Sequence, residues 1–78
     1  MHLNIKLIGR LTEFERGDGV VTFANRANII EVLSELGVPY DQVGPVSLND
    51  SIVSKDQWGD TVLSEGDQLT VMPPIKGG

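Results

Sequence analysis

Residues 27–39, ANIIEVLSELGVP, decide how the chain folds. Apolar residues recur here at intervals of three and four, the spacing that places them along one side of an α-helix. Glu31, Ser34 and Glu35 fall largely outside that side. The segment therefore predicts one amphipathic helix, with an apolar side that carries Ile29, Ile30, Val32, Leu33 and Leu36.

Both ends of this helix have recognisable signals. Asn28 followed by Glu31 has the spacing of a capping arrangement at a helix start, and Asn25 is the alternative cap. Gly37 can take the left-handed conformation that ends a helix, and Pro39 prevents its continuation. We expect a helix of about ten residues, or roughly 15 Å, long enough to cross a small sheet once.

Strand patterns flank the helix on both sides. Apolar and polar residues alternate from Leu3 to Ile8, and residues 20–23 are β-branched or aromatic. The charged, glycine-bearing segment 13–19 suits a turn between them, which predicts a hairpin. Further strands are expected at 46–48, 52–53 and 68–72, with turns at Asn49-Asp50 and Glu65-Gly66-Asp67.

This order of elements predicts a two-layer α+β domain. A sheet with one apolar face needs a cover, and a single amphipathic helix can supply it. We expect a sheet of four to five strands covered by one main helix, with residues 1–72 as the domain. Pro73 and Pro74 then direct the chain out of the sheet, because proline donates no ladder hydrogen bond. Residues 73–78 are predicted to be a flexible C-terminal tail.

Composition restricts the classes of function. The chain has 78 residues, enough for one small domain, and eleven Asp and Glu against six Lys and Arg give a net charge of -5. Negative charge opposes binding to nucleic acid or an anionic membrane and favours a basic patch on a protein partner. With no signal peptide pattern and no long apolar run, we expect a soluble, cytoplasmic protein.

Side-chain chemistry is sparse in this sequence. There is no cysteine, and His2 is the one histidine, so a thiol nucleophile is excluded and no metal site is predicted. Residues 49–51 and 56–60 lack the ligand alternation and final Glu of a calcium loop. Trp58 has two interpretations, a lid over the edge of the core or part of a partner-docking surface.

The C-terminal residues 73–78, PPIKGG, carry the strongest functional signal. Two prolines stiffen the base of this segment, while two glycines leave its tip without side chains. Fully extended, six residues reach up to about 20 Å. A terminal Gly78 would present its carboxylate at the end of a narrow probe, which suits entry into an enzyme tunnel.

Three segments resemble the MoaD and ThiS sulfur carriers, which share the ubiquitin-like β-grasp fold. Residues 71–78, VMPPIKGG, are similar to the ending of the small subunit of molybdopterin synthase. Residues 63–69, LSEGDQL, are similar to the family's turn and last strand. The pattern from Asn49 to Trp58 is closer to carriers of the thiamine pathway. The resemblance covers nearly the whole chain and implies a mixed sheet.

The resemblance also implies a mechanism and partners. A ubiquitin-activating-like adenylyltransferase would use ATP to adenylate Gly78, and a sulfur atom would then replace one oxygen to give a thiocarboxylate. The recipient would be the large subunit of molybdopterin synthase or a thiazole synthase. The carrier itself would bind no cofactor and would not be an enzyme. Gly78 is then the reacting residue, and the tunnel-binding residues are Pro73, Pro74, Ile75, Lys76 and Gly77.

Several alternatives stay open at this point. Phe14, Trp58 and Met72 could form the apolar centre of a partner surface, or they could simply pack in the core. The sulfur could go to molybdopterin, our first expectation, or to the thiazole of thiamine. The chain could instead be a ubiquitin-like modifier that joins target lysines, or an interaction module with an unmodified tail.

Overall fold

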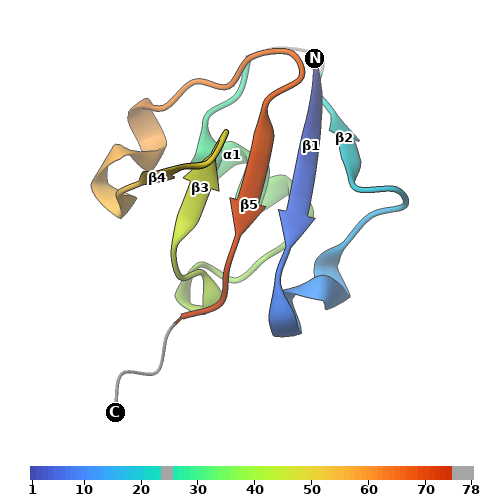
Figure 1. The fold of residues 1–78 in the computed structure, drawn as a ribbon, viewed down its shortest axis with the longest axis vertical. Helices are drawn as coiled ribbons and strands as arrows, with labels where there is room; N and C mark the ends of the chain where they lie inside the picture. The colour runs from blue at the N-terminus through green and yellow to red at the C-terminus, as the bar shows by residue number, and fades with distance from the viewer. Residues whose placement is uncertain (24–25, 75–78) are drawn as a thin grey trace.

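The computed structural model describes residues 1–23 and 26–74, and in these residues one helix covers a mixed sheet. The sheet has five strands in the order β2-β1-β5-β3-β4 (Figure 1). Strand β5 pairs in parallel with β1 and antiparallel with β3, and the two outer pairings are antiparallel. The strands are β1 (His2–Leu7), β2 (Val20–Thr22), β3 (Val46–Leu48), β4 (Ser51–Val53) and β5 (Gln68–Val71). The predicted α+β architecture is therefore confirmed.

Alternation along the strands gives the sheet one buried face. In β1 every second residue is buried, and the register aligns Ile5 with Leu69 and Leu7 with Val71. Val46 joins the same layer because it pairs with Val71 from the other side. The polar residues of β1 and β5 consequently lie on the opposite, open face of the sheet.

Helix α1 (Ile29–Leu36) begins and ends where the capping signals predict. The Asn28 side chain accepts from the Glu31 N–H at 2.8 Å, the Glu31 carboxylate accepts from the Asn28 N–H at 3.0 Å, and Gly37 has a φ of 76°. Asn25, the alternative cap, lies outside the described residues. The helix has eight residues and not about ten, because Asn28 is the extended cap and Ala27 precedes it.

The predicted apolar side of α1 is wrong at one position. Ile29, Val32, Leu33 and Leu36 are buried against the sheet, but the side chain of Ile30 is 40% exposed. Successive residues of an α-helix are rotated by about 100°, so Ile30 lies well away from the centre of the buried stripe. It remains at the margin of the helix, facing Gly59.

Within residues 1–23 and 26–74, three short 3-10 helices connect the elements, and the sequence patterns did not predict them. They carry core residues into positions that strands and helix leave open, with Leu11 in the first and Trp58 in the third. The bounds are η1 (Gly9–Phe14), η2 (Tyr40–Gln42) and η3 (Lys55–Asp60). The predicted tight turn between β3 and β4 is confirmed, with φ of 49° at Asn49 and 71° at Asp50.

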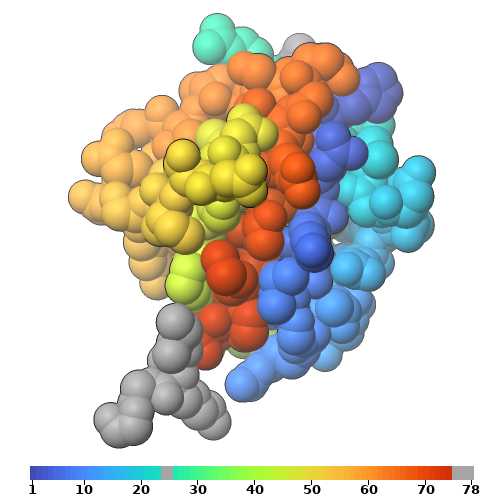
Figure 2. Space-filling view, in the orientation of Figure 1, coloured from blue at the N-terminus to red at the C-terminus, as the bar shows by residue number. Residues whose placement is uncertain are grey.

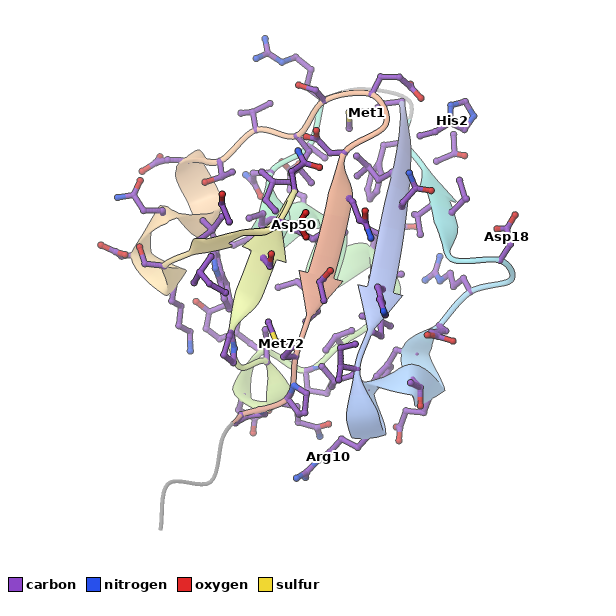
Figure 3. The ribbon with its side chains drawn as sticks, viewed as in Figure 1. Met1, His2, Arg10, Asp18, Asp50 and Met72 are labelled. Carbon is purple, nitrogen blue, oxygen red and sulfur yellow. The ribbon has the colours of Figure 1, made fainter. Side chains whose placement is uncertain are left out.

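Across these described ranges, no helix has the length and apolar character needed to span a membrane. The first described residues and the last lie at opposite ends of the sheet. Figure 3 places Met1 and His2 at one end and Met72 toward the other. The last described residues, Pro73 and Pro74, follow β5 beyond that second end (Figure 1).

Candidate functional site

The predicted site residues divide into a described group and a group outside the described residues. Ile75, Lys76, Gly77 and Gly78 belong to the second group. Met72, Pro73 and Pro74 are described, and we call these three residues the tail root. Met72 and Pro73 are half-buried and Pro74 is exposed. The structure therefore shows how the predicted tail is attached to the domain.

The tail root continues a central strand of the sheet. β5 lies between β1 and β3, and the Ile8 N–H donates to the Val71 carbonyl at 3.0 Å, just past the end of the β1 pairing. Pro73 then ends the ladder because it has no N–H to donate. Two neighbouring strands thus hold the chain immediately before the tail root.

A pair of backbone hydrogen bonds holds the first residue of the tail root. The Gly44 N–H donates to the Met72 carbonyl at 2.7 Å, and the Met72 N–H donates to the Pro45 carbonyl at 3.0 Å. Gly44 and Pro45 belong to the connection between η2 and β3. No helix, strand or site residue was predicted from the sequence in this connection, and its Gly-Pro dipeptide was the available signal for a close backbone approach.

Trp58 belongs to the core. Its side chain is 2% exposed, and its indole Nε1–H donates to the Val53 carbonyl at 2.9 Å. The core interpretation is confirmed, and the docking-surface interpretation is wrong for this residue. The physical reason is that η3 contacts α1, and the indole fills core volume while its N–H still finds an acceptor.

Phe14 and Met72 are half-buried, and Phe14 packs against the core from outside. The three residues of the predicted partner surface are not brought together as one patch. Phe14 ends η1, which leads from β1 toward the β2 edge, whereas Trp58 follows β4 at the other edge (Figure 1). Met72 directly follows the central strand β5, which lies between β1 and β3.

An aromatic and cationic cluster lies above Trp58, and sequence reasoning missed it. The Tyr40 ring meets the Trp58 ring edge-on, with centroids 5.7 Å apart, and the Lys55 ammonium lies 4.3 Å from the Tyr40 centroid. This arrangement ties η2 to η3 at the surface. Tyr40 and Lys55 are far apart in sequence, so no local pattern could indicate the contact.

The pKa of Glu65 is lowered at the end of the sheet opposite the tail root. The backbone N–H of His2 donates to the Glu65 carboxylate at 3.0 Å and lowers the pKa of Glu65, with a further contribution from the His2 ring. No group of three His, Cys, Asp or Glu capable of holding a metal occurs within residues 1–23 and 26–74.

The family model described as ThiS family matches residues 5–78. The chain belongs to the ThiS family. This membership confirms the resemblance inferred from the three segments of sequence, and the chain is a ThiS-family sulfur carrier. No curated protein sequence matches the chain significantly.

Solved structures agree with this ThiS-family assignment in fold. The crystal structure of the thiamine biosynthesis protein ThiS from Geobacter metallireducens matches with a TM-score of 0.72 and 22% identity. SAMP1 from Haloferax volcanii gives 0.69 and 23%, and a chain of the complex of subunits 1 and 2 of molybdopterin-converting factor from Helicobacter pylori gives 0.64 and 19%. Each match covers 100% of both chains, and the ubiquitin-like β-grasp fold is confirmed.

Proposed function

We propose that this ThiS-family chain carries sulfur as a thiocarboxylate on Gly78 and donates it in molybdopterin biosynthesis. The observation that carries the proposal is the tail root. A central strand, held by both neighbours, leads directly into Pro73-Pro74, and two hydrogen bonds fix the last residue before the prolines. In this proposal the folded domain holds the base of the tail, and the C-terminal residues carry the reacting group.

The proposed chemistry takes place at the main-chain carboxylate. A carboxylate is a poor electrophile, so an activating enzyme of the adenylyltransferase class joins Gly78 to AMP and releases pyrophosphate from ATP. A persulfide sulfur of the partner then attacks the acyl carbon, and AMP leaves, which gives an acyl disulfide. A thiol attacks the other sulfur of this disulfide, so that the S–S bond breaks, a new disulfide forms between the thiol and the former persulfide carrier, and the thiocarboxylate is released. The resulting thiocarboxylate delivers sulfide within a second enzyme. In this scheme the chain is a substrate protein, and ATP is bound by the partner.

Two observations bear on the recipient. The Pro73-Pro74 pair and the glycine ending are similar to the small subunit of molybdopterin synthase, and the Helicobacter pylori neighbour is part of a two-subunit complex of molybdopterin-converting factor. These support a large synthase subunit as the partner. A thiazole synthase is the second candidate, favoured by the Asn49–Trp58 pattern and by the Geobacter metallireducens neighbour.

The direct test is the intact mass of the full chain isolated from its native cells under thiol-preserving conditions, with fragmentation to locate any change. We expect a mass increase equal to the exchange of one oxygen for one sulfur, confined to Gly78. In a parallel assay, an activating enzyme with ATP should form a Gly78 acyl adenylate. If that enzyme activates a control carrier and leaves this chain unreacted, the proposal fails.

A second assay separates the recipients. The thiocarboxylated chain is offered in turn to a large synthase subunit with the pterin precursor and to a thiazole synthase with its substrates. We expect the sulfur of the Gly78 thiocarboxylate to be transferred to the pterin precursor in the first reaction. Transfer in the second reaction alone would assign the chain to thiamine, and isopeptide-linked adducts in cell extracts would point to a protein modifier.

A further inference from the structure

We propose that Gly44 is a positioning residue for the tail: its missing side chain lets the tail root lie directly against the backbone before β3 and so sets the direction in which the tail leaves the domain. The expected effect on thiocarboxylate formation rests on the proposed function. The contact itself is a property of the fold and can be measured on the chain alone.

The close approach at Gly44 is between two backbones. A Cβ atom at residue 44 would lie 2.6 Å from the Pro73 carbonyl carbon and 2.7 Å from the Pro74 Cα, distances that real Cβ atoms do not adopt. The obstructing atoms are main-chain atoms, so no side-chain rotation could make room. Any residue other than glycine at position 44 must therefore move the tail root and the backbone of residue 44 apart.

The requirement for glycine here concerns space and not backbone conformation. Gly9, Gly37 and Gly66 have φ values in the left-handed region, where glycine is favoured whatever the surroundings. Gly44 lies outside that region. Alanine could adopt its backbone conformation, and the contact with the tail root is what opposes it.

Pro73 is confined on its other side as well. A Cβ at Gly9, in the segment after β1, would lie 3.4 Å from the Pro73 Cγ. Because β5 lies between β1 and β3, the chain leaving β5 passes between segments that continue or precede its two neighbours. Figure 2 shows the red end of β5 at the surface between the blue segment after β1 and the lime segment before β3. We call Gly9 and Gly44 the glycine seat.

The glycine seat and the hydrogen bonds act on adjacent residues. Met72 is held at both its N–H and its carbonyl, and Pro73, which follows at once, lies against Gly44. The proline ring restricts the φ torsion, so the orientation of Pro73 at the glycine seat limits the direction in which Pro74 follows. A reacting group at the end of such a segment is sensitive to small changes in direction, and a misplacement near 1 Å can lower a rate about 100-fold.

Gly44→Ala in the full chain tests the proposal, and Gly59→Ala is the matched control. A Cβ at Gly59 would lie 3.6 Å from Ile30 Cδ1, an ordinary contact, and Gly59 is also outside the left-handed region. Amide hydrogen exchange should be faster by about tenfold at residues 44 and 72 in Gly44→Ala, because their paired hydrogen bonds are weakened. Exchange at Ile8 should not change. Gly59→Ala should resemble the wild type at all three amides.

The same two variants are then used as substrates of the activating enzyme. We expect Gly44→Ala to lower kcat for thiocarboxylate formation about 100-fold while KM is unchanged, since the domain still docks and the tail is misdirected. Gly59→Ala should have wild-type kcat.

The inference is overturned if Gly44→Ala matches Gly59→Ala in amide hydrogen exchange, or if the exchange of Gly44→Ala changes while its kcat does not. A wild-type chain that no activating enzyme accepts would refute the proposed function, and exchange alone would then decide whether Gly44 holds the tail root.

A second background keeps the test decisive if Gly44→Ala does not fold. Pro73→Gly and Pro74→Gly together give the tail root freedom to move away from residue 44. In that double variant, addition of Gly44→Ala should leave the urea midpoint unchanged, whereas in the wild-type background it should lower the midpoint. An equal loss in both backgrounds would show that the tail root is not what excludes a side chain, and would overturn the proposal.

Discussion

Leu33 is one of the residues through which α1 packs on the sheet. Its side chain is 2% exposed, and the neighbouring turn of the helix buries Ile29 and Leu36 around it. Leu33→Ala should lower the free energy of unfolding by about 2–5 kcal/mol, because it removes buried methyl groups and leaves a cavity. Urea unfolding followed by circular dichroism measures the loss.

Ile30→Ala on the same helix is the natural control. Ile30 is partly exposed, so its truncation should cost clearly less than that of Leu33. Equal losses for the two variants would mean that the side of α1 facing the sheet has been misassigned.

Gly78 is the residue on which the proposed chemistry depends. Gly78→Ala should leave the urea midpoint unchanged and abolish thiocarboxylate formation, because the added methyl group would sit beside the reacting carboxylate in a narrow tunnel. Extension of the chain by one residue should have the same effect. The yield of thiocarboxylate by intact mass is the readout, and a variant that reacts at the wild-type rate would contradict the role of Gly78.

Helix α1 shows how local signals act at the level of an element. The reciprocal hydrogen bonds of Asn28 and Glu31 satisfy two N–H groups at its start. Asn28→Ala removes one of these bonds and should lower the free energy of unfolding by about 1 kcal/mol. Glu31→Gln, which can still accept from the Asn28 N–H, should cost less. If both variants unfold at the wild-type urea concentration, the capping box contributes nothing to stability.

The turn before β5 is fastened to the start of β1 through Glu65. Because the His2 N–H and the His2 ring lower the pKa of Glu65 below its ordinary value of 4.5, folding favours the carboxylate. The stabilisation is therefore present above that ordinary value and is lost as the pH falls through the lowered pKa. Solvent screening keeps it small, since Glu65 is exposed.

The corresponding prediction is a difference between two pH profiles. As the pH is lowered from about 6 to about 3, the wild type should lose more stability than Glu65→Gln, whose side chain does not titrate in this range. Urea midpoints at a series of pH values give both curves. Parallel curves would show that the contact with His2 makes no net contribution to folding.

At the scale of the whole molecule, the net charge and the position of the tail root both favour the proposed encounter with the activating enzyme. The net charge of -5 favours approach to a basic partner, while the sheet presents the tail root at the end opposite Met1 and His2 (Figure 3). The association rate constant with the activating enzyme should therefore fall several-fold as salt is raised from about 0.05 M to about 0.5 M. The dissociation rate should change little. An association rate independent of salt would exclude electrostatic steering.

The sequence by itself determined the elements that depend on near neighbours. The capping signal at Asn28, the helix end at Gly37 and the β3–β4 turn all follow from residues within a few positions of one another. The short range of capping, turn conformation and hydrophobic periodicity is the physical reason.

Only the tertiary structure decided the features made by distant segments. The parallel pairing of β1 with β5, the burial of Trp58 and the contact of Gly44 with Pro73 each depend on parts of the chain that are far apart in sequence. Such contacts form when elements pack in three dimensions, where available space and hydrogen-bond partners select among local options. For this reason the tail could be predicted from sequence as the candidate site, whereas the backbone seat that directs it could not.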